Sequence, residues 1–253
     1  MPIETIAPQG LQPVPIRIRN IGKEVGEGST APYYCTLRGV LKFDSSSDAP
    51  NCVYDELVAM RLGLIVGAPI AAGALVAAER GDGFASLMVG AVNFALPDLL
   101  DSQWREAAEA FPNHAASLVA FDIFIGNVDR AGNLKADMRR KNMNFFAGFD
   151  HSHCLLDCTL EPGDSLDWLG SDALIVEEHP FFQQAPIKIA RVKQYVKRIQ
   201  ELPDSVIRSA CMLGDIFRRV SVDEQEALAD ALCTRRDRLL SIVEDNKSKI
   251  FFW

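Results

Sequence analysis

The most informative stretch of this sequence is residues 118–153, LVAFDIFIGNVDRAGNLKADMRRKNMNFFAGFDHSH. Leu118 to Ile125 is almost entirely apolar and predicts a buried helix. A short loop of glycine, asparagine and aspartate follows at 126–133, and a basic turn then leads to a predicted strand at 144–149. The stretch therefore predicts a buried helix and a strand that are joined by polar loops.

Three polar side chains lie where these loops meet the buried elements. Asp129 and Asn133 are in the loop after the helix, and Asp150 directly follows the strand. Loops on a rigid scaffold can hold such side chains close together, and carboxylate and amide oxygens are ligands that Mg²⁺ accepts. We therefore expect a site for a metal ion and a phosphate, and phosphoryl transfer is the working hypothesis.

Asp122 lies inside the apolar helix, where a buried carboxylate needs polar partners. It could brace the loop that follows the helix, or it could face a polar seam between elements. His114 and His179 have no obvious partners in the sequence, and we expect both to be structural.

Composition favours a globular chain with a sizeable core, since 48% of the 253 residues are hydrophobic and 24% are charged. The net charge of -8 argues against a mainly electrostatic nucleic-acid binder, so we expect no direct nucleic-acid partner. No apolar run approaches the ~20 residues of a membrane span. The first ten residues lack the features of a secretory signal, so the six scattered cysteines predict reduced thiols in a cytoplasmic protein.

The first part of the chain predicts a small, mostly antiparallel sheet that carries one helix. Residues 33–43 form a predicted β-hairpin that turns at Arg38-Gly39, and residues 70–94 form a second hairpin. Between them, an apolar stripe at helical spacing predicts a helix over 53–66.

From residue 96 onward the pattern becomes helical. Helices are predicted at 102–111, 114–126, 187–201, 204–219 and 222–247. Ser221 to Glu224 fits a capping box for the last of these, whereas 159–185 predicts no regular element. We therefore expect an α+β fold with a β-rich domain at 1–95 and a helical domain at 96–253.

Two upstream side chains have both an ordinary and a functional interpretation. Lys42 alternates with its apolar neighbours on a predicted strand and could simply face solvent. Glu56 lies in the first turn of a predicted helix, where a carboxylate favours the helix dipole. Alternatively, the two side chains form an ion pair across a cleft.

Residues 22–30, GKEVGEGST, form a glycine-rich turn. Its glycines permit close backbone approach, and its amides and hydroxyls can bind a phosphate. An ordinary hairpin turn is the simpler alternative, because the stretch matches neither a P-loop nor a full G-x-G-x-x-G pattern.

Four stretches, in this order, resemble the HipA-like kinases, a bacterial branch of the protein-kinase-like fold related to the phosphatidylinositol 3- and 4-kinases. They are the turn at Gly26–Thr30, Val40-Leu41-Lys42-Phe43, Asp55-Glu56-Leu57-Val58-Ala59, and Phe124-Ile125-Gly126-Asn127-Val128-Asp129-Arg130 with Asn133 and Phe149-Asp150-His151. The resemblance implies a bilobal fold, with a small antiparallel β-sheet N-lobe that carries one helix and a mostly helical C-lobe. The nucleotide would lie between the lobes.

The resemblance also implies roles for single residues. The residues implied to bind ATP are Lys42, Glu56, Gly26, Gly28, Ser29 and Thr30. Asp129 would orient the acceptor hydroxyl and take its proton, and Asn133 and Asp150 would hold Mg²⁺. The segment 88–94 would be the adenine-binding hinge. The implied function is an ATP- and Mg²⁺-dependent phosphotransferase that acts on a Ser or Thr hydroxyl of a protein substrate.

The chain departs from the family pattern at the catalytic loop. The pattern places the metal-binding asparagine five residues after the catalytic aspartate, with a histidine just after the Asp-Arg pair. Here Asn133 follows Asp129 by four residues, and Ala131 replaces the histidine. A pseudokinase that serves as a nucleotide-binding or protein-interaction module therefore stays open as an alternative, and so does a lipid or small-molecule kinase.

His151, His153, Cys154 and Cys158 are dense enough to suggest zinc. However, Cys-x₃-Cys is not the usual spacing of a structural zinc site. If Asp150 ends a strand, these side chains also alternate in direction and cannot all converge.

Overall fold

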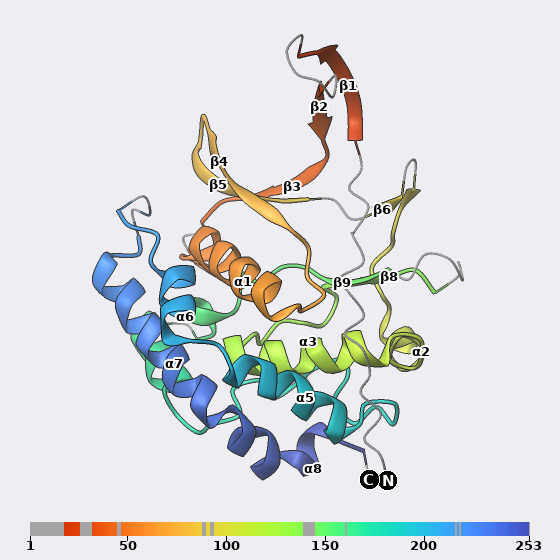
Figure 1. The fold of residues 1–253 in the computed structure, drawn as a ribbon, viewed down its shortest axis with the longest axis vertical. Coiled ribbons are helices and arrows are strands. Elements are labelled where there is room, and N and C mark those ends of the chain that lie inside the picture. The colour runs from red at the N-terminus through yellow and green to blue at the C-terminus, as the bar shows by residue number, and fades with distance from the viewer. Residues whose placement is uncertain are drawn as a thin grey trace.

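The computed structural model describes residues 18–25, 32–44, 47–87, 90–91, 94–138, 145–159, 161–215, 217 and 219–252. The strands of its first half lie on one side of the molecule, and most helices lie on the other (Figure 1). Within the described ranges, no helix combines the length and apolar character that a membrane crossing requires.

The first half is centred on a three-stranded antiparallel sheet. β3 (Gly39–Lys42), β5 (Gly81–Leu87) and β4 (Gly73–Ala78) are paired in that spatial order. α1 (Cys52–Val66) packs against β4 and β5. The predicted second hairpin is therefore confirmed for β4 and β5, and the predicted helix at 53–66 is confirmed as α1.

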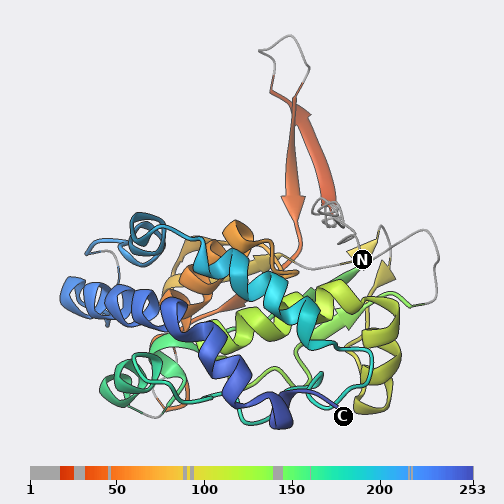
Figure 2. The same ribbon diagram turned by 60° about the horizontal axis from the view of Figure 1, so that its bottom comes forward.

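The hairpin predicted at 33–43 is wrong. β2 (Tyr33–Leu37) pairs with β1 (Ile18–Glu24), whereas β3 pairs with β5. Only Arg38 separates β2 from β3, and a single residue is too short a connection for the tight hairpin turns that reverse a chain. The β1–β2 ribbon consequently stands away from the rest of the molecule (Figures 1 and 2).

The second half is built around α3 (Pro112–Ile125), which is buried continuously from residue 115 to its end. α2 (Trp104–Ala110), α5 (Ile189–Gln200) and α7 (Val222–Asp245) pack against it. A helix that is covered on all sides needs the nearly uniform apolar sequence that this stretch has. In Figure 1, α3 lies at the centre of the helical half.

The remaining elements are β6 (Gly90–Ala91) paired with β7 (Phe94–Ala95), β8 (Leu134–Ala136) paired with β9 (Phe146–Gly148), α4 (Pro162–Leu169), α6 (Asp204–Cys211), α8 (Lys247–Ile250) and 3₁₀ turns at Asp101–Gln103 and Leu155–Asp157. β9 confirms the strand predicted at 144–149, whereas β8 was not predicted. β7 ends at the domain boundary placed at 95/96, and the division into two domains remains a prediction.

Two helical predictions need correction. α4 lies in 159–185, where no element was predicted. The prediction missed it because its first residues, Pro162 and Gly163, give a weak helical signal.

The second correction concerns α6, which ends at Cys211 rather than at 219. Buried Gln225 of α7 holds the next loop by accepting the N–H groups of residues 213 and 214. The capping box at Ser221 and Glu224 is confirmed.

Several contacts tie the two halves together. Ile70 forms a parallel bridge with Gly148, and the backbone N–H of Asp157 donates to the buried carboxylate of Asp55 at 3.0 Å. The N–H and side-chain amide of Asn51 donate to the carboxylate of Asp157 at 2.8 and 2.9 Å. The end of β9 is thereby tied to the segment after α1, and the 3₁₀ turn at Leu155–Asp157 is tied to the start of α1.

Candidate functional site

Lys42 and Glu56 form the ion pair that the sequence suggested. Lys42 is the last residue of β3, and Glu56 lies in the first part of α1. The distance from Lys42 Nζ to Glu56 Oε1 is 2.6 Å, and the side chains are 19% and 3% exposed. Lys42 is therefore not an ordinary solvent-facing strand lysine.

Asp150 contacts the same lysine from a third element. It follows β9 and has a φ of 58°, in the left-handed region that few non-glycine residues adopt. Its Oδ1 forms a salt bridge with Lys42 Nζ and accepts a hydrogen bond from Ser152 Oγ at 2.7 Å. One ammonium group is thus shared between two carboxylates that are far apart in the sequence.

The three charges stabilise one another. Burial alone would lower the pKa of Lys42, but the Glu56 and Asp150 carboxylates raise it above its usual value. Burial alone would raise the pKa of Glu56 and of Asp150, but the surrounding donors lower both. These donors are His151 and Lys42 for Glu56, and Lys42 and Ser152 for Asp150. All three groups are therefore charged at neutral pH.

The loop after α3 presents Asp129 to solvent and turns tightly back on itself. α3 ends at Gly126, whose φ is 66°. Asn127 is buried, and its Oδ1 accepts the N–H of Asp129 at 3.1 Å. Asn133 Nδ2 donates to the Asp129 carbonyl at 2.7 Å and to its carboxylate at 3.3 Å. Asp129 and Asn133 are therefore in direct contact across the four-residue step.

Buried Arg130 joins this loop to the end of β9. Its Nε and Nη2 donate to the two carboxylate oxygens of Asp122 at 2.8 and 2.9 Å. Its Nη1 donates to the carbonyls of Asn133 at 3.2 Å and of Phe149 at 2.6 Å. The N–H of Phe149 also donates to the Asn133 carbonyl at 3.1 Å. The backbone of Asn133 therefore lies next to the residue that precedes Asp150.

Asp122 braces the loop, which is one of the two roles that the sequence left open. Besides Arg130, it accepts Asn127 Nδ2 at 3.1 Å and contacts His179 Nε2 at 3.0 Å. Burial opposes ionisation of Asp122, but Arg130 and His179 lower its pKa far below the usual value. The contact between His179 and Asp122 was not predicted. A buried carboxylate in α3 implies a partner, but no local pattern in the sequence indicates that this partner lies 57 residues away.

Some predicted site residues lie outside the described part of the chain. These are Gly26, Gly28, Ser29 and Thr30, together with most of the segment proposed as the hinge, 88–94. Their predicted contacts with ATP remain predictions.

The residues suggested for zinc face different partners. His151 Nδ1 lies 3.4 Å from Glu56 Oε2, whereas Cys154 Sγ donates to the His151 carbonyl. Cys158 Sγ is directed at the Ser165 carbonyl at 4.0 Å. Across the described ranges, no three His, Cys, Asp or Glu side chains come together as a metal-binding group.

Asn133 and Asp150, the residues predicted to hold Mg²⁺, carry oxygen donors of the kind that this ion accepts beside phosphates. Mg²⁺ in such sites takes one or two protein carboxylates and completes its shell with water and phosphate oxygens. Asp150 offers a carboxylate that is 27% exposed. Because Asn133 turns its amide nitrogen toward Asp129, its Oδ1 is the end available to a cation. Both donors are hard oxygens on adjacent backbone segments.

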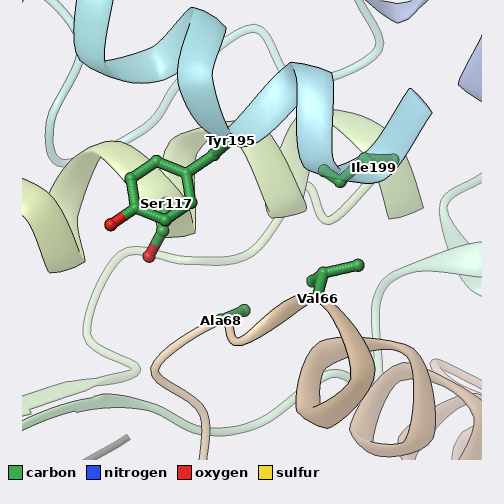
Figure 3. Close-up of a pocket in the computed structure, with 5 residues that line it drawn as sticks. All are labelled: Val66, Ala68, Ser117, Tyr195 and Ile199. Atoms are coloured by element: carbon green, nitrogen blue, oxygen red, sulfur yellow. The ribbon is translucent and has the colours of Figure 1, made fainter. Parts of the chain in front are cut away.

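A separate crevice lies between the end of α1, α3 and α5 (Figure 3). It is lined by Val66, Ala68, Ser117, Tyr195 and Ile199. The crevice is too narrow to hold a water molecule, so it is a packing seam rather than a ligand site. None of the residues predicted for the site lines it.

Comparison with known proteins gives structural matches only. The sequence matches no family model and no curated protein. The fold is similar to that of the Helicobacter pylori proinflammatory kinase CtkA, with a TM-score of 0.54 and 16% identity, covering 91% of this chain and 95% of that one. It is also similar to HipA of Shewanella oneidensis MR-1, solved in a complex with HipB and operator DNA. For HipA the TM-score is 0.54 and the identity 12%, over 86% of this chain and 62% of that one.

These matches confirm the predicted resemblance to HipA-like kinases at the level of fold, together with the α+β, bilobal kinase-like architecture. The chain spans less than two thirds of the HipA structure that it matches. At such low identities the matches establish the fold, and the activity has to be argued from the site itself.

Proposed function

We propose that this protein is a kinase that uses ATP and Mg²⁺ and binds the nucleotide between its β-rich and helical halves. The observation that carries the proposal is the convergence of Lys42, Glu56 and Asp150 beside the loop that holds Asp129 and Asn133. A lysine held by a helix glutamate is the cation that kinases direct at the α- and β-phosphates. The kinase-like fold supports the same interpretation.

Each residue has a role that suits its position. Lys42 binds phosphate oxygens, and Glu56 keeps it directed into the site. Asp129 is exposed at the loop tip, where it can orient an acceptor hydroxyl and accept its proton. Asn133 and Asp150 hold Mg²⁺, which when bound neutralises the charge of the transferred phosphoryl group. Buried Arg130 and Asp122 position the loop that carries Asp129 and Asn133 and the end of β9 that leads to Asp150.

The proposed acceptor is a Ser or Thr hydroxyl of a protein. The exposure of Asp129 supports a bulky acceptor, because a macromolecule can reach it without entering a deep pocket. A phosphoamino-acid analysis of proteins labelled with Mg-[γ-³²P]ATP tests this choice, since Ser or Thr phosphate is expected. Label that partitions only into a lipid extract or small molecules would contradict it.

A pseudokinase is the second candidate, and two observations favour it. The Asp129–Asn133 step is one residue shorter than the family pattern. In addition, the Asp150 carboxylate that would bind the metal is engaged by Lys42 in this structure. On this alternative the protein binds a nucleotide or a protein partner without transferring phosphate.

Replacing Asp129 separates the two candidates. We expect Asp129→Ala to reduce phosphoryl transfer at least about hundredfold, because general-base and orienting groups contribute on that scale, while Mg-ATP affinity stays within about threefold. Asp245→Ala, an exposed aspartate at the end of α7, serves as the control and should match wild type. Transfer that is unchanged in Asp129→Ala would refute the assignment of the base, and a wild type without transfer would favour the pseudokinase.

We also propose a cytoplasmic location. All six cysteines are unpaired in the structure, and five of them are buried. Burial raises the pKa of several of these thiols, for example that of Cys158 to about 11, which makes them unreactive. Such thiols suit a reducing compartment.

A further inference from the structure

His151 is a buried histidine that the proposed chemistry leaves without a role. It directly follows Asp150 and is only 2% exposed. Its Nδ1 lies 3.4 Å from Glu56 Oε2, and its ring meets the ring of Phe121 edge to face, with 6.3 Å between centroids. Its Nε2 is buried and has no hydrogen-bond partner in the described part of the chain.

The carboxylate of Glu56 needs a second donor. The Glu56 side chain is 3% exposed, and Lys42 satisfies only Oε1. A buried carboxylate oxygen that is left unpaired is costly, and a carboxylate held at one oxygen can rotate away from its lysine. His151 is the group that faces Oε2. This contact therefore sets the plane of the carboxylate that holds Lys42.

The backbone of Asp150 explains why two successive residues reach the same ion pair. Its left-handed φ of 58° turns the chain sharply after β9. The Asp150 side chain contacts Lys42, and the His151 side chain contacts Glu56. The dipeptide thus holds both members of the pair, one from the exposed side and one from the core.

We propose that His151 is a positioning residue: the hydrogen on its Nδ1 holds Glu56 Oε2, and Glu56 in turn keeps Lys42 aligned for phosphate. This inference rests on the proposed kinase function and adds a residue to its nucleotide site. The geometry assigns the proton to Nδ1, because only that nitrogen faces an acceptor.

The alternative is that His151 only fills space beside Phe121. Three substitutions distinguish the two roles. His151→Asn places an amide N–H near the position of Nδ1, whereas His151→Gln places it near that of Nε2. His151→Phe keeps an aromatic ring, although a larger one, and removes both nitrogens. If only packing matters, Gln, which is close in size to histidine, should outperform the smaller Asn. If the donor matters, Asn should be best.

The test measures the Kd of the full chain for a non-hydrolysable ATP analogue with Mg²⁺ by calorimetry. We expect His151→Phe and His151→Gln to weaken binding about tenfold, the scale of a lost hydrogen bond to a charged group, and His151→Asn to stay within about threefold of wild type. The opposite order would overturn the proposal. If the His151→Phe or His151→Gln protein does not fold, the Kd of His151→Asn alone distinguishes the two roles. A packing role predicts weaker binding by this variant, because asparagine is the smallest of the three side chains.

A double-mutant cycle with Glu56→Gln provides a second readout. If His151 acts through Glu56, His151→Phe should weaken binding less than about twofold further in the Glu56→Gln background. If the two substitutions weaken binding independently, so that their fold-changes in Kd multiply, the proposal is overturned. A wild type that binds no Mg-ATP analogue would instead refute the proposed function, and this inference with it. Normal binding by wild type and His151→Phe alike would refute the inference alone.

Discussion

At the scale of single residues, the best-supported feature of the site is the buried pair of Asp122 and Arg130. Both side chains are fully buried, and they form two hydrogen bonds with each other. The Nη1 of Arg130 donates to the carbonyls of residues 133 and 149. One guanidinium therefore determines how the loop that carries Asp129 lies against the strand that leads to Asp150.

Asp122→Asn should destabilise the protein by about 3–5 kcal/mol, because it leaves a buried guanidinium without its counter-charge. Urea denaturation measures the effect. Asp172→Asn is a matched control, since Asp172 pairs with Arg238 at 3.4 Å on the surface, where both side chains are well exposed. The control should be close to wild type. Equal stability of Asp122→Asn and Asp172→Asn would show that the buried pair has no such role.

The same pair predicts a dependence on pH. The pKa of Asp122 is lowered in the folded state, against the effect of burial, by Arg130 and His179. A carboxyl with a lowered folded pKa stabilises the protein above its unfolded pKa of about 4, and this stabilisation is lost as pH falls below that value. The difference in unfolding free energy between wild type and Asp122→Asn should therefore shrink between about pH 5 and pH 3. A difference that stays constant over this window would contradict the prediction.

At the scale of elements, the end of α3 decides where the loop begins. Gly126 has a φ of 66°, and a Cβ added there would lie 3.1 Å from Leu169 Cδ2. The left-handed backbone and the close neighbour both disfavour a side chain at this position. The helix stops here for a local reason, and the loop with Asn127 and Asp129 starts at a defined point.

Gly126→Ala should lower the unfolding free energy by about 1–2 kcal/mol, because alanine is strained at this φ. Gly163→Ala in α4 is the control, since a Cβ there meets nothing within 4 Å. That change should be neutral or stabilising by about 0.5 kcal/mol, as alanine favours a helix. Thermal or urea unfolding of the two variants checks the prediction. A Gly126→Ala protein as stable as Gly163→Ala would mean that the α3 end tolerates other conformations.

At the scale of the whole molecule, the sequence predicted α1 and α3 well, since both carry strong helical patterns with glycine at their ends. It also gave the contact between Lys42 and Glu56 and the bracing role of Asp122, each as one of two alternatives, and the structure contains both. These features depend on local pattern or on the ordered stretches that resemble the kinases. The α+β class was predicted from the change of pattern near residue 96 and the bilobal architecture from the resemblance, and the structural matches confirm both.

The remaining features depend on contacts between distant segments. The pairing of β2 with β1 instead of β3 is a choice of partner that alternation of side chains cannot make. His151 and His179 contact Glu56 and Asp122 from other elements, so each histidine has no distinguishing local signal. α6 ends early because Gln225, on the next helix, binds the backbone after it. Each of these was set by tertiary contacts rather than by local preference.

The proposed kinase activity depends on Lys42, Asn133 and Asp150 forming a Mg-ATP site. Calorimetric titration with a non-hydrolysable ATP analogue, with and without Mg²⁺, measures whether they do. We predict that wild type binds the analogue and that removing Mg²⁺ weakens binding. Asp150→Ala and Lys42→Ala should each weaken Mg-dependent binding at least about tenfold, the scale of one lost charged contact. Equal affinity in wild type and both variants, or no binding by wild type, would show that these residues do not form a Mg-ATP site.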